Sequence, residues 1–119
     1  MERVRRILRR AFGEAVSEAP GEQGFFVAVG RIGVRVQVQE SGAVQCYSWI
    51  AQEREITSEL GLAIARRNQS LTFGSLSVDG EDAIILEHWL FPESVDKVVL
   101  PRLVTLIAAM ADSIDDELR

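Results

Sequence analysis

The 119-residue sequence predicts an α+β domain of two layers, in which segregated helices cover a five-stranded antiparallel sheet. Three observations support this: an amphipathic, arginine-rich start, alternating apolar and polar residues in the middle, and a helical apolar stripe near the end. Short turns between the alternating segments indicate antiparallel neighbours. The expected order of elements is α-β-β-β-α-β-β-α, in a single domain over residues 1–119.

The first segment is predicted to be an amphipathic helix of about 14 residues. Its apolar residues recur at helical spacing and are Val4, Ile7, Leu8, Ala11, Ala15 and Val16. Proline cannot continue a helix and glycine lets the chain leave it. We therefore expect the helix to end near Ala19-Pro20-Gly21.

Three strands are expected next. Phe25–Val29 is rich in β-forming residues, Ile32–Val38 alternates valine or isoleucine with polar residues and glycine, and Ala43–Gln52 alternates again. Turns at Gly30-Arg31 and at Glu40-Ser41-Gly42 separate them. Short turns join these strands into an antiparallel meander.

A second helix is predicted after the meander, on the spacing of Ile56, Leu60, Ala63, Ile64 and Arg67. Asn68 is expected to end it, since asparagine tolerates the left-handed conformation. Gly61 inside this helix costs about 1 kcal/mol relative to alanine, which predicts close packing against a neighbour.

Leu71–Val78 and Asp82–Phe91 are predicted to form a hairpin closed by a tight Asp79-Gly80 turn, whose central residues need positive φ. A change of alternation near Gly74 indicates a bulge.

A final helix is expected within Val95–Leu118, although Pro101 requires either a start near Leu100 or a kink. Its stripe comprises Val95, Val98, Val99, Leu103, Ile107, Met110, Ile114 and Leu118. Val104 and Leu106 make it wider than a thin sheet needs. The surplus predicts a dimer interface formed by Leu103, Leu106, Ile107 and Met110.

Composition and cysteine usage indicate a cytoplasmic globular protein. Hydrophobic residues make up 47% of the chain and charged residues 26%, which argues against disorder. The single cysteine, Cys46, cannot form an intramolecular disulfide and suits a reducing compartment. The N-terminus lacks the apolar region of a signal peptide, and no segment has the length of a membrane span.

The net charge of −5 is unevenly distributed. The first twelve residues hold five arginines against Glu2, a local charge of +4, so the remainder carries −9. Acidic residues crowd near the end of the chain, at Asp112, Asp115, Asp116 and Glu117. A mainly acidic body repels nucleic acid at long range and suits basic, polar or partly folded protein partners.

The arginines of the first helix have three interpretations. They form a solvated face, they contact an acidic surface, or they bind nucleic acid or an anionic membrane. The third lacks aromatic residues for stacking or insertion. The candidates for electrostatic contact are Arg5, Arg6, Arg9 and Arg10.

The sequence predicts no catalytic residue, metal site or cofactor. His88 is the only histidine and Cys46 the only cysteine, so a Cys-His pair is the one nucleophilic option, and a zinc site lacks ligands. The C-terminal carboxylates fit a solvated helix end, with a divalent-cation site as an alternative. Gly30-Arg31-Ile32-Gly33 links two strands, so it is no phosphate-binding loop.

Aromatic residues are the candidates for partner binding. Tyr47 and Trp49 share the strand face opposite Val44, Cys46 and Ile50, while Trp89 and Phe91 share a face with Ile85. In a two-layer domain helices cover one sheet face, so large aromatics on the other would form a partner or dimer surface. The alternative places them in the core or under the first helix.

The order of elements resembles the type III secretion chaperone-like superfamily, in particular its YbjN-like branch. The resemblance rests on the first helix, on Ile32–Val38, on Ala65-Arg66-Arg67-Asn68, on residues 73–80 from Phe73 to Gly80, on Ile84–Leu90 and on a long helix with Ala111-Asp112.

This resemblance implies an α+β fold, homodimerisation, and binding of extended or partly folded polypeptides without catalysis. The leading hypothesis is therefore a small acidic chaperone or adaptor. The alternative is a regulatory module that binds a small ligand or nucleic acid through its arginine-rich helix, and charge reversal there would discriminate the two.

Overall fold

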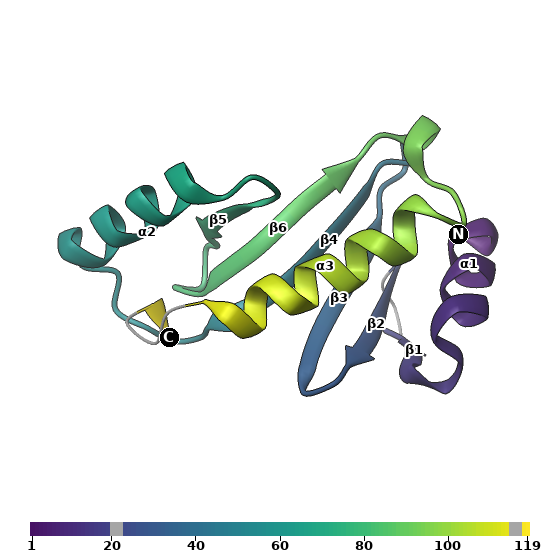
Figure 1. Cartoon of the computed structure of the whole chain (residues 1–119), viewed down its shortest axis with the longest axis horizontal. Helices are drawn as coiled ribbons and strands as arrows, with labels where there is room; N and C mark the ends of the chain where they lie inside the picture. Colours follow the sequence, from purple (N-terminus) through teal and green to yellow (C-terminus); the bar gives the residue numbers. More distant parts are fainter. Residues whose placement is uncertain (20–22, 115–117) are drawn as a thin grey trace.

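The computed structural model describes residues 1–19, 23–114 and 118–119. These residues form one antiparallel sheet of six strands, in the order β1-β2-β3-β4-β6-β5, with a long helix across one face (Figure 1). The elements are α1 (Glu2–Phe12), β1 (Val16–Glu18), β2 (Gly24–Val29), β3 (Ile32–Val38), β4 (Val44–Ala51), α2 (Ser58–Ser70), β5 (Ser75–Val78), β6 (Ile84–Leu90) and α3 (Val99–Ser113), with short 3₁₀ turns at Gly13–Ala15 and Pro92–Ser94.

The α+β fold class is confirmed, but the prediction of five strands is wrong. Helix α1 ends at Phe12 because Gly13 adopts a φ of 59°, which carries the chain out of the helix. Val16 therefore lies in the additional strand β1 and pairs with Val27, although its spacing had placed it on the helix. Pro20 and Gly21, where the helix was expected to end, lie outside the described residues.

The core lies between α3 and one face of the sheet. Helix α3 packs on β2, β3, β4 and β6 and buries six side chains, Leu100, Leu103, Val104, Ile107, Ala108 and Ala111. Side chains that alternate along the strands face it, among them the fully buried Val34, Val36, Val44, Cys46 and Leu86. The helix layer and the sheet layer thus each bury one face in a shared core, as the predicted two-layer architecture requires.

Helix α3 begins at Val99, so the expected start near Leu100 is correct and Pro101 sits in the first turn. The Asp96 carboxylate receives hydrogen bonds from the backbone N–H groups of Val98 (2.8 Å) and Val99 (2.7 Å). These backbone donors hold the pKa of Asp96 below its ordinary value, and the positive charges of Arg3 and Lys97 act in the same direction. Asp96 therefore caps this helix.

Helix α2 covers the outer edge of β5. Its first turn is capped by Thr57, whose hydroxyl accepts from the Leu60 N–H at 3.1 Å. Asn68 lies inside the helix rather than ending it, and its amide bonds to both backbone groups of Leu76: Nδ2 donates to O at 3.0 Å, and Oδ1 accepts from N at 2.7 Å. The Asn68 side chain thus satisfies edge groups that would otherwise be open to another strand.

The predicted packing at Gly61 is wrong, because a Cβ built there would meet nothing within 4 Å.

The predicted Asp79-Gly80 turn between β5 and β6 is wrong in its length. The Asp79 N–H donates to Ala83 O (2.9 Å), and Asp79 Oδ1 accepts from the N–H groups of Glu81 and Ala83, which closes a longer loop. Asp82, with a φ of 58°, takes the left-handed conformation that the sequence analysis assigned to the Asp79-Gly80 pair.

The predicted bulge is displaced. Gly74 precedes β5, with a φ of 71°, and a Cβ there would lie 3.0 Å from Glu87 O. The irregularity in pairing lies in β4 instead, between Trp49 and Ala51.

Candidate protein-binding face

The two faces of the sheet differ in their side chains. On the side away from α3, most alternate residues of β2, β3, β4, β6 and β5 are polar or aromatic and half-exposed or exposed, while Ile85 is buried. We call this surface the open face, and its members are Phe26, Arg35, Gln37, Gln45, Tyr47, Trp49, Ser77, Ile85, Glu87 and Trp89. The strand register places Tyr47 between Arg35 and Glu87, and Gln45 beside Trp89.

Glu87 organises the centre of the open face. Its carboxylate accepts hydrogen bonds from Gln45 Nε2 at 3.0 Å and from Trp89 Nε1 at 2.9 Å, and a further one from Ser77 Oγ. The bond to the indole N–H restrains the orientation of the Trp89 ring. Because Trp89 is 49% exposed, this ring presents a large apolar surface that is already oriented.

Tyr47 and Trp49 pack against each other on the open face. Their rings meet edge to face, with centroids 5.3 Å apart and an interplanar angle of 76°. The Tyr47 hydroxyl donates to Gln37 Oε1 at 3.5 Å, and burial raises the pKa of Tyr47. The pair is therefore half-buried and packed against its neighbours rather than projecting into solvent.

Phe26 is an exposed aromatic that the sequence analysis missed. Its ring lies across Gly33 on the neighbouring strand, and a Cβ at Gly33 would fall 2.2 Å from Phe26 Cζ. The absence of a side chain at Gly33 thus leaves the space that the end of the Phe26 ring occupies on β3. Strict alternation through Phe25–Val29 would have found it, because Phe25 is fully buried and its neighbour must face the other way.

The four residues predicted to bind a partner fall in different settings. The shared face of Tyr47 and Trp49, opposite Val44 and Cys46, is confirmed, and Trp89 lies on that same face. Phe91 follows the end of β6 and is 75% exposed, compared with 49% for Trp89 and 38% for Phe26. Whether these residues bind a partner stays a prediction.

The predicted dimer residues divide into two pairs. Leu103 and Ile107 are 3% and 0% exposed, since the domain's own sheet covers them, so a single copy presents almost no surface at either position. Leu106 is half-exposed, and Met110 is half-buried against the core. Fewer apolar side chains of α3 are thus left for a dimer interface than the sequence indicated. The reason is that the core of the domain itself buries more residues of α3 than expected.

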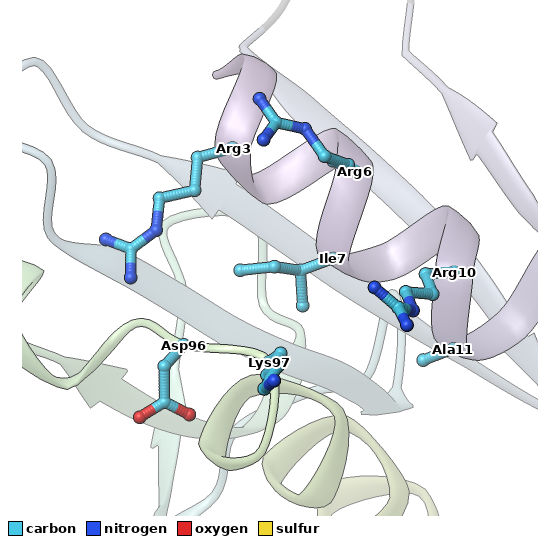
Figure 2. A pocket seen from close by; sticks show the side chains of 7 residues that line it. All are labelled: Arg3, Arg6, Ile7, Arg10, Ala11, Asp96 and Lys97. Carbon is cyan, nitrogen blue, oxygen red and sulfur yellow. The ribbon is translucent and has the colours of Figure 1, made fainter.

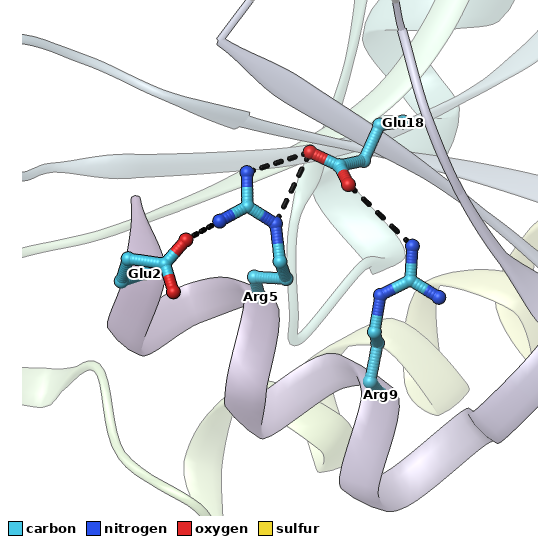
Figure 3. Close-up of polar contacts among 4 residues, drawn as sticks. All are labelled: Glu2, Arg5, Arg9 and Glu18. Carbon is cyan, nitrogen blue, oxygen red and sulfur yellow. Dashed lines mark hydrogen bonds and ion pairs between the residues drawn. The ribbon is translucent and has the colours of Figure 1, made fainter.

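The arginines of α1 also divide into two groups, and Figure 3 shows Arg5 and Arg9, the group that faces Glu18. Arg5 Nε and Nη2 donate to Glu18 Oε1 at 3.1 and 2.6 Å, Arg5 also pairs with Glu2, and Arg9 Nη2 lies 3.5 Å from Glu18 Oε2. These hydrogen bonds and charges hold the pKa of Glu18 below its ordinary value, with the Arg5 bond as the largest cause.

Arg6 and Arg10 project to another side of α1 and line a cleft together with Arg3, Ile7, Ala11, Asp96 and Lys97 (Figure 2). The four arginines that the sequence analysis grouped are therefore two pairs in different surroundings. Arg3 belongs with the second pair.

Cys46 and His88 lie directly opposite one another on β4 and β6. Burial raises the pKa of Cys46 to about 12, so this thiol is not a nucleophilic thiolate near neutral pH. The His88 ring instead packs on Phe73, with centroids 4.6 Å apart. Within residues 1–19, 23–114 and 118–119, no cluster of three or more His, Cys, Asp or Glu could hold a metal ion. Of the C-terminal carboxylates considered for a cation site, Asp112 instead accepts a hydrogen bond from Arg31 Nε at 2.7 Å. The other three, Asp115, Asp116 and Glu117, lie outside these residues.

None of the helices in the described part of the chain is long and apolar enough to cross a membrane.

Comparison with known proteins identifies the family. Residues 1–119 match the family model TY-Chap1, described as T3SS (YopN, CesT) and YbjN peptide-binding chaperone 1. The chain belongs to this family. The resemblance to the YbjN-like branch is therefore confirmed. In a separate comparison, no curated protein sequence matches the chain.

Solved structures share the fold at low identity. A chain of the HopA1–SchA chaperone–effector complex matches with a TM-score of 0.69 and 9% identity, over 93% of this chain and 88% of that one. A chain of the complex between the Yersinia pestis type III secretion chaperone SycH and a stable fragment of YscM2 matches with a TM-score of 0.66 and 14% identity, over 96% and 98%. At these identities the likeness establishes the fold.

Proposed function

We propose that this protein is a non-enzymatic chaperone or adaptor that binds an extended or partly folded polypeptide across the open face of its sheet. The observation that carries the proposal is the exposure of Trp89 (49%) and Phe91 (75%) on and beside a sheet face opposite the packed helix. Membership of a peptide-binding chaperone family supports it. Aromatic residues of this kind provide large contact areas at low cost in conformational entropy.

The geometry favours the face over the β5 edge as the binding surface. Extended peptides bind sheets either by adding a strand at an edge or by placing side chains on a face. At the β5 edge, the Asn68 amide already occupies the N–H and C=O groups of Leu76. The open face instead offers the oriented Trp89 ring and polar neighbours such as Gln45, which can bond to a peptide backbone.

A displayed library of random dodecamer peptides tests the proposal. We expect selected peptides to bind the protein and to lose at least about tenfold in affinity on Trp89→Ala, since a central aromatic contact contributes about 2 kcal/mol or more. Leu62→Ala is the matched control, because Leu62 is 52% exposed but lies on α2. Equal losses in the two variants, or a library that yields no binder, would refute this function.

We also propose that the protein forms a homodimer through the flank of α3 that carries Val99 and Met110. These positions are eleven residues apart, about three helical turns, so they share one side of the helix. We expect light scattering to give twice the 13.2 kDa chain mass, and Val99→Glu with Met110→Glu to give the monomer. Leu62→Glu is the control that leaves the dimer intact, and a wild-type monomer at 100 µM would contradict the proposal.

The predicted cytoplasmic location rests on the single, buried Cys46, and it stays a prediction.

A further inference from the structure

Helix α1 keeps a group of cations on the side away from its ion pairs. Arg3, Arg6 and Arg10 are spaced by three and four residues and therefore line one side of the helix. Figure 2 shows them along a cleft whose other wall carries Asp96 and Lys97. Unlike Arg5 and Arg9, none of the three arginines has a hydrogen bond or ion pair to any residue that the structure describes.

The cleft is large enough for a segment of chain and is strongly positive. Its volume is about 540 Å³, and the four cationic side chains are opposed by the single carboxylate of Asp96. That carboxylate already accepts the N–H groups of Val98 and Val99 at the start of α3. The arginine side chains are therefore left with their donors directed at solvent or at a ligand.

The three arginines repel one another along the helix. Like charges at three- and four-residue spacing destabilise a helix. Arg3 also lies in the first turn of α1, where the helix dipole disfavours a cation. Arg10, in the last turn, suits the dipole, and the charge of Arg3 acts favourably on Asp96, so the repulsion is only partly offset within the domain. An anionic ligand would relieve the rest.

The cleft continues into an apolar groove. Ala11 lines both, and the groove, of about 620 Å³, is bounded by Phe12 of α1 and by Val98 and Pro101 of the α3 segment. Val98 is 56% exposed, so its apolar side chain is open to a ligand in the groove. A ligand that fills both parts carries negative charge at one end and an apolar group at the other.

Nucleic acid fits these features poorly. The lining of the cationic cleft contains no aromatic side chain on which a base could stack. The acidic remainder of the chain repels a long polyanion. A polypeptide segment provides both carboxylates and apolar side chains within a few residues.

We propose that the cleft between α1 and the start of α3 binds an acidic segment of the polypeptide client, with an adjacent apolar residue in the groove beside Phe12 and Val98. The inference rests on the proposed function, since it assumes a polypeptide ligand. It assigns the side of α1 that carries Arg3, Arg6 and Arg10 to a charge-selective contact, separate from the aromatic contact on the sheet.

The probe is a fluorescein-labelled peptide, Asp-Glu-Asp-Glu-Ser-Leu-Phe-Leu, measured by anisotropy at low salt. Two comparison peptides replace the acids by Asn and Gln, or the three apolar residues by Ser. We expect the acidic apolar peptide to bind roughly tenfold more tightly than either, and its affinity to fall as salt is raised. Equal binding of the probe and its Asn/Gln counterpart would overturn the proposal.

Matched variants on one helix locate the contact. We expect Arg6→Gln to weaken binding by roughly threefold and the triple change Arg3→Gln, Arg6→Gln and Arg10→Gln by roughly tenfold or more. Arg9→Gln removes the same charge from the same helix, but from the side facing Glu18, so its effect should stay below about twofold. Circular dichroism checks that each variant is folded, and equal effects of Arg6→Gln and Arg9→Gln would refute the site.

Further measurements separate this inference from the proposed function. Loss of probe binding on Trp89→Ala, with the triple arginine variant unaffected, would place the acidic peptide on the open face and overturn only the cleft. Displacement by inorganic phosphate, with no contribution from the apolar residues, would overturn it in favour of a small-anion site. Tighter binding of a single-stranded oligonucleotide than of the probe would overturn it in favour of nucleic acid.

Discussion

The two faces of the same sheet are built on one alternating pattern but have different consequences. Toward α3, the residues Val34, Val36, Val44 and Cys46 are all fully buried. Toward the open face, residues of the same two strands include Arg35, Gln45, Tyr47 and Trp49, none of which is fully buried. One face therefore excludes water by packing, while the other keeps large aromatic side chains in partial contact with water.

The difference separates stability from recognition. Apolar burial against α3 stabilises the fold, at roughly 25 cal/mol for each Å² removed from water. On the open face, hydrogen bonds from Gln45 and Trp89 to Glu87 orient side chains without covering them. Substitutions on the two faces should accordingly change different measured quantities.

The largest expected effect is on the covered face. Ile107→Ala should lower the free energy of unfolding by about 3 kcal/mol, because it leaves a cavity between α3 and the sheet. Trp89→Ala on the open face should lower it by less than about 1 kcal/mol, since half of that side chain is already in water. Urea unfolding measures both, and losses of equal size would remove the distinction between the faces.

The second effect concerns the β5 edge of the sheet, where Asn68 of α2 binds the backbone of Leu76. Asn68→Ala removes both hydrogen bonds to the backbone of Leu76, so we expect a loss of about 1–2 kcal/mol in unfolding free energy. Gln69→Ala, at the exposed neighbouring position, is the control and should change stability by less than about 0.5 kcal/mol. If Asn68→Ala were as mild as the control, β5 would not depend on α2 for its edge.

The smallest effect lies at the solvated ion pairs between α1 and β1. The pKa of Glu18 is lowered from 4.5 by Arg5 and Arg9, so its stabilising contribution is present above that pH and is lost as the pH falls below it. Glu18→Gln should therefore destabilise the protein slightly at pH 7, and the difference from wild type should shrink toward acid. Urea unfolding at several pH values tests the direction, and a difference that grows on acidification would contradict it.

Strand faces could be predicted from the sequence because they follow a period of two that no distant contact alters. The alternation in Ile32–Val38 and Ala43–Gln52 placed Tyr47 and Trp49 opposite Cys46 correctly. The end of the first helix could not be predicted this way, since the positive φ of Gly13 leaves no mark on apolar spacing. The additional strand β1 was lost for the same reason.

The candidate sites depended more on tertiary contacts. A helical stripe does not reveal how much of it the domain's own core uses, and so Leu103 and Ile107 were assigned to a dimer surface. The division of the arginines likewise required the position of Glu18, which the sequence analysis placed in a helix. Only its location on β1 distinguishes the paired Arg5 from the cleft-lining Arg6.

Fluorescence of Trp89 tests the role of the open face most directly. In the variant Trp49→Phe, Trp89 is the only tryptophan, and its emission and its quenching by acrylamide report on that face alone. On addition of a library-selected peptide, we expect the emission to move to shorter wavelength and the quenching constant to fall, because the peptide covers the ring. A peptide that binds with unchanged affinity while Trp89 stays as accessible as before would contradict the account.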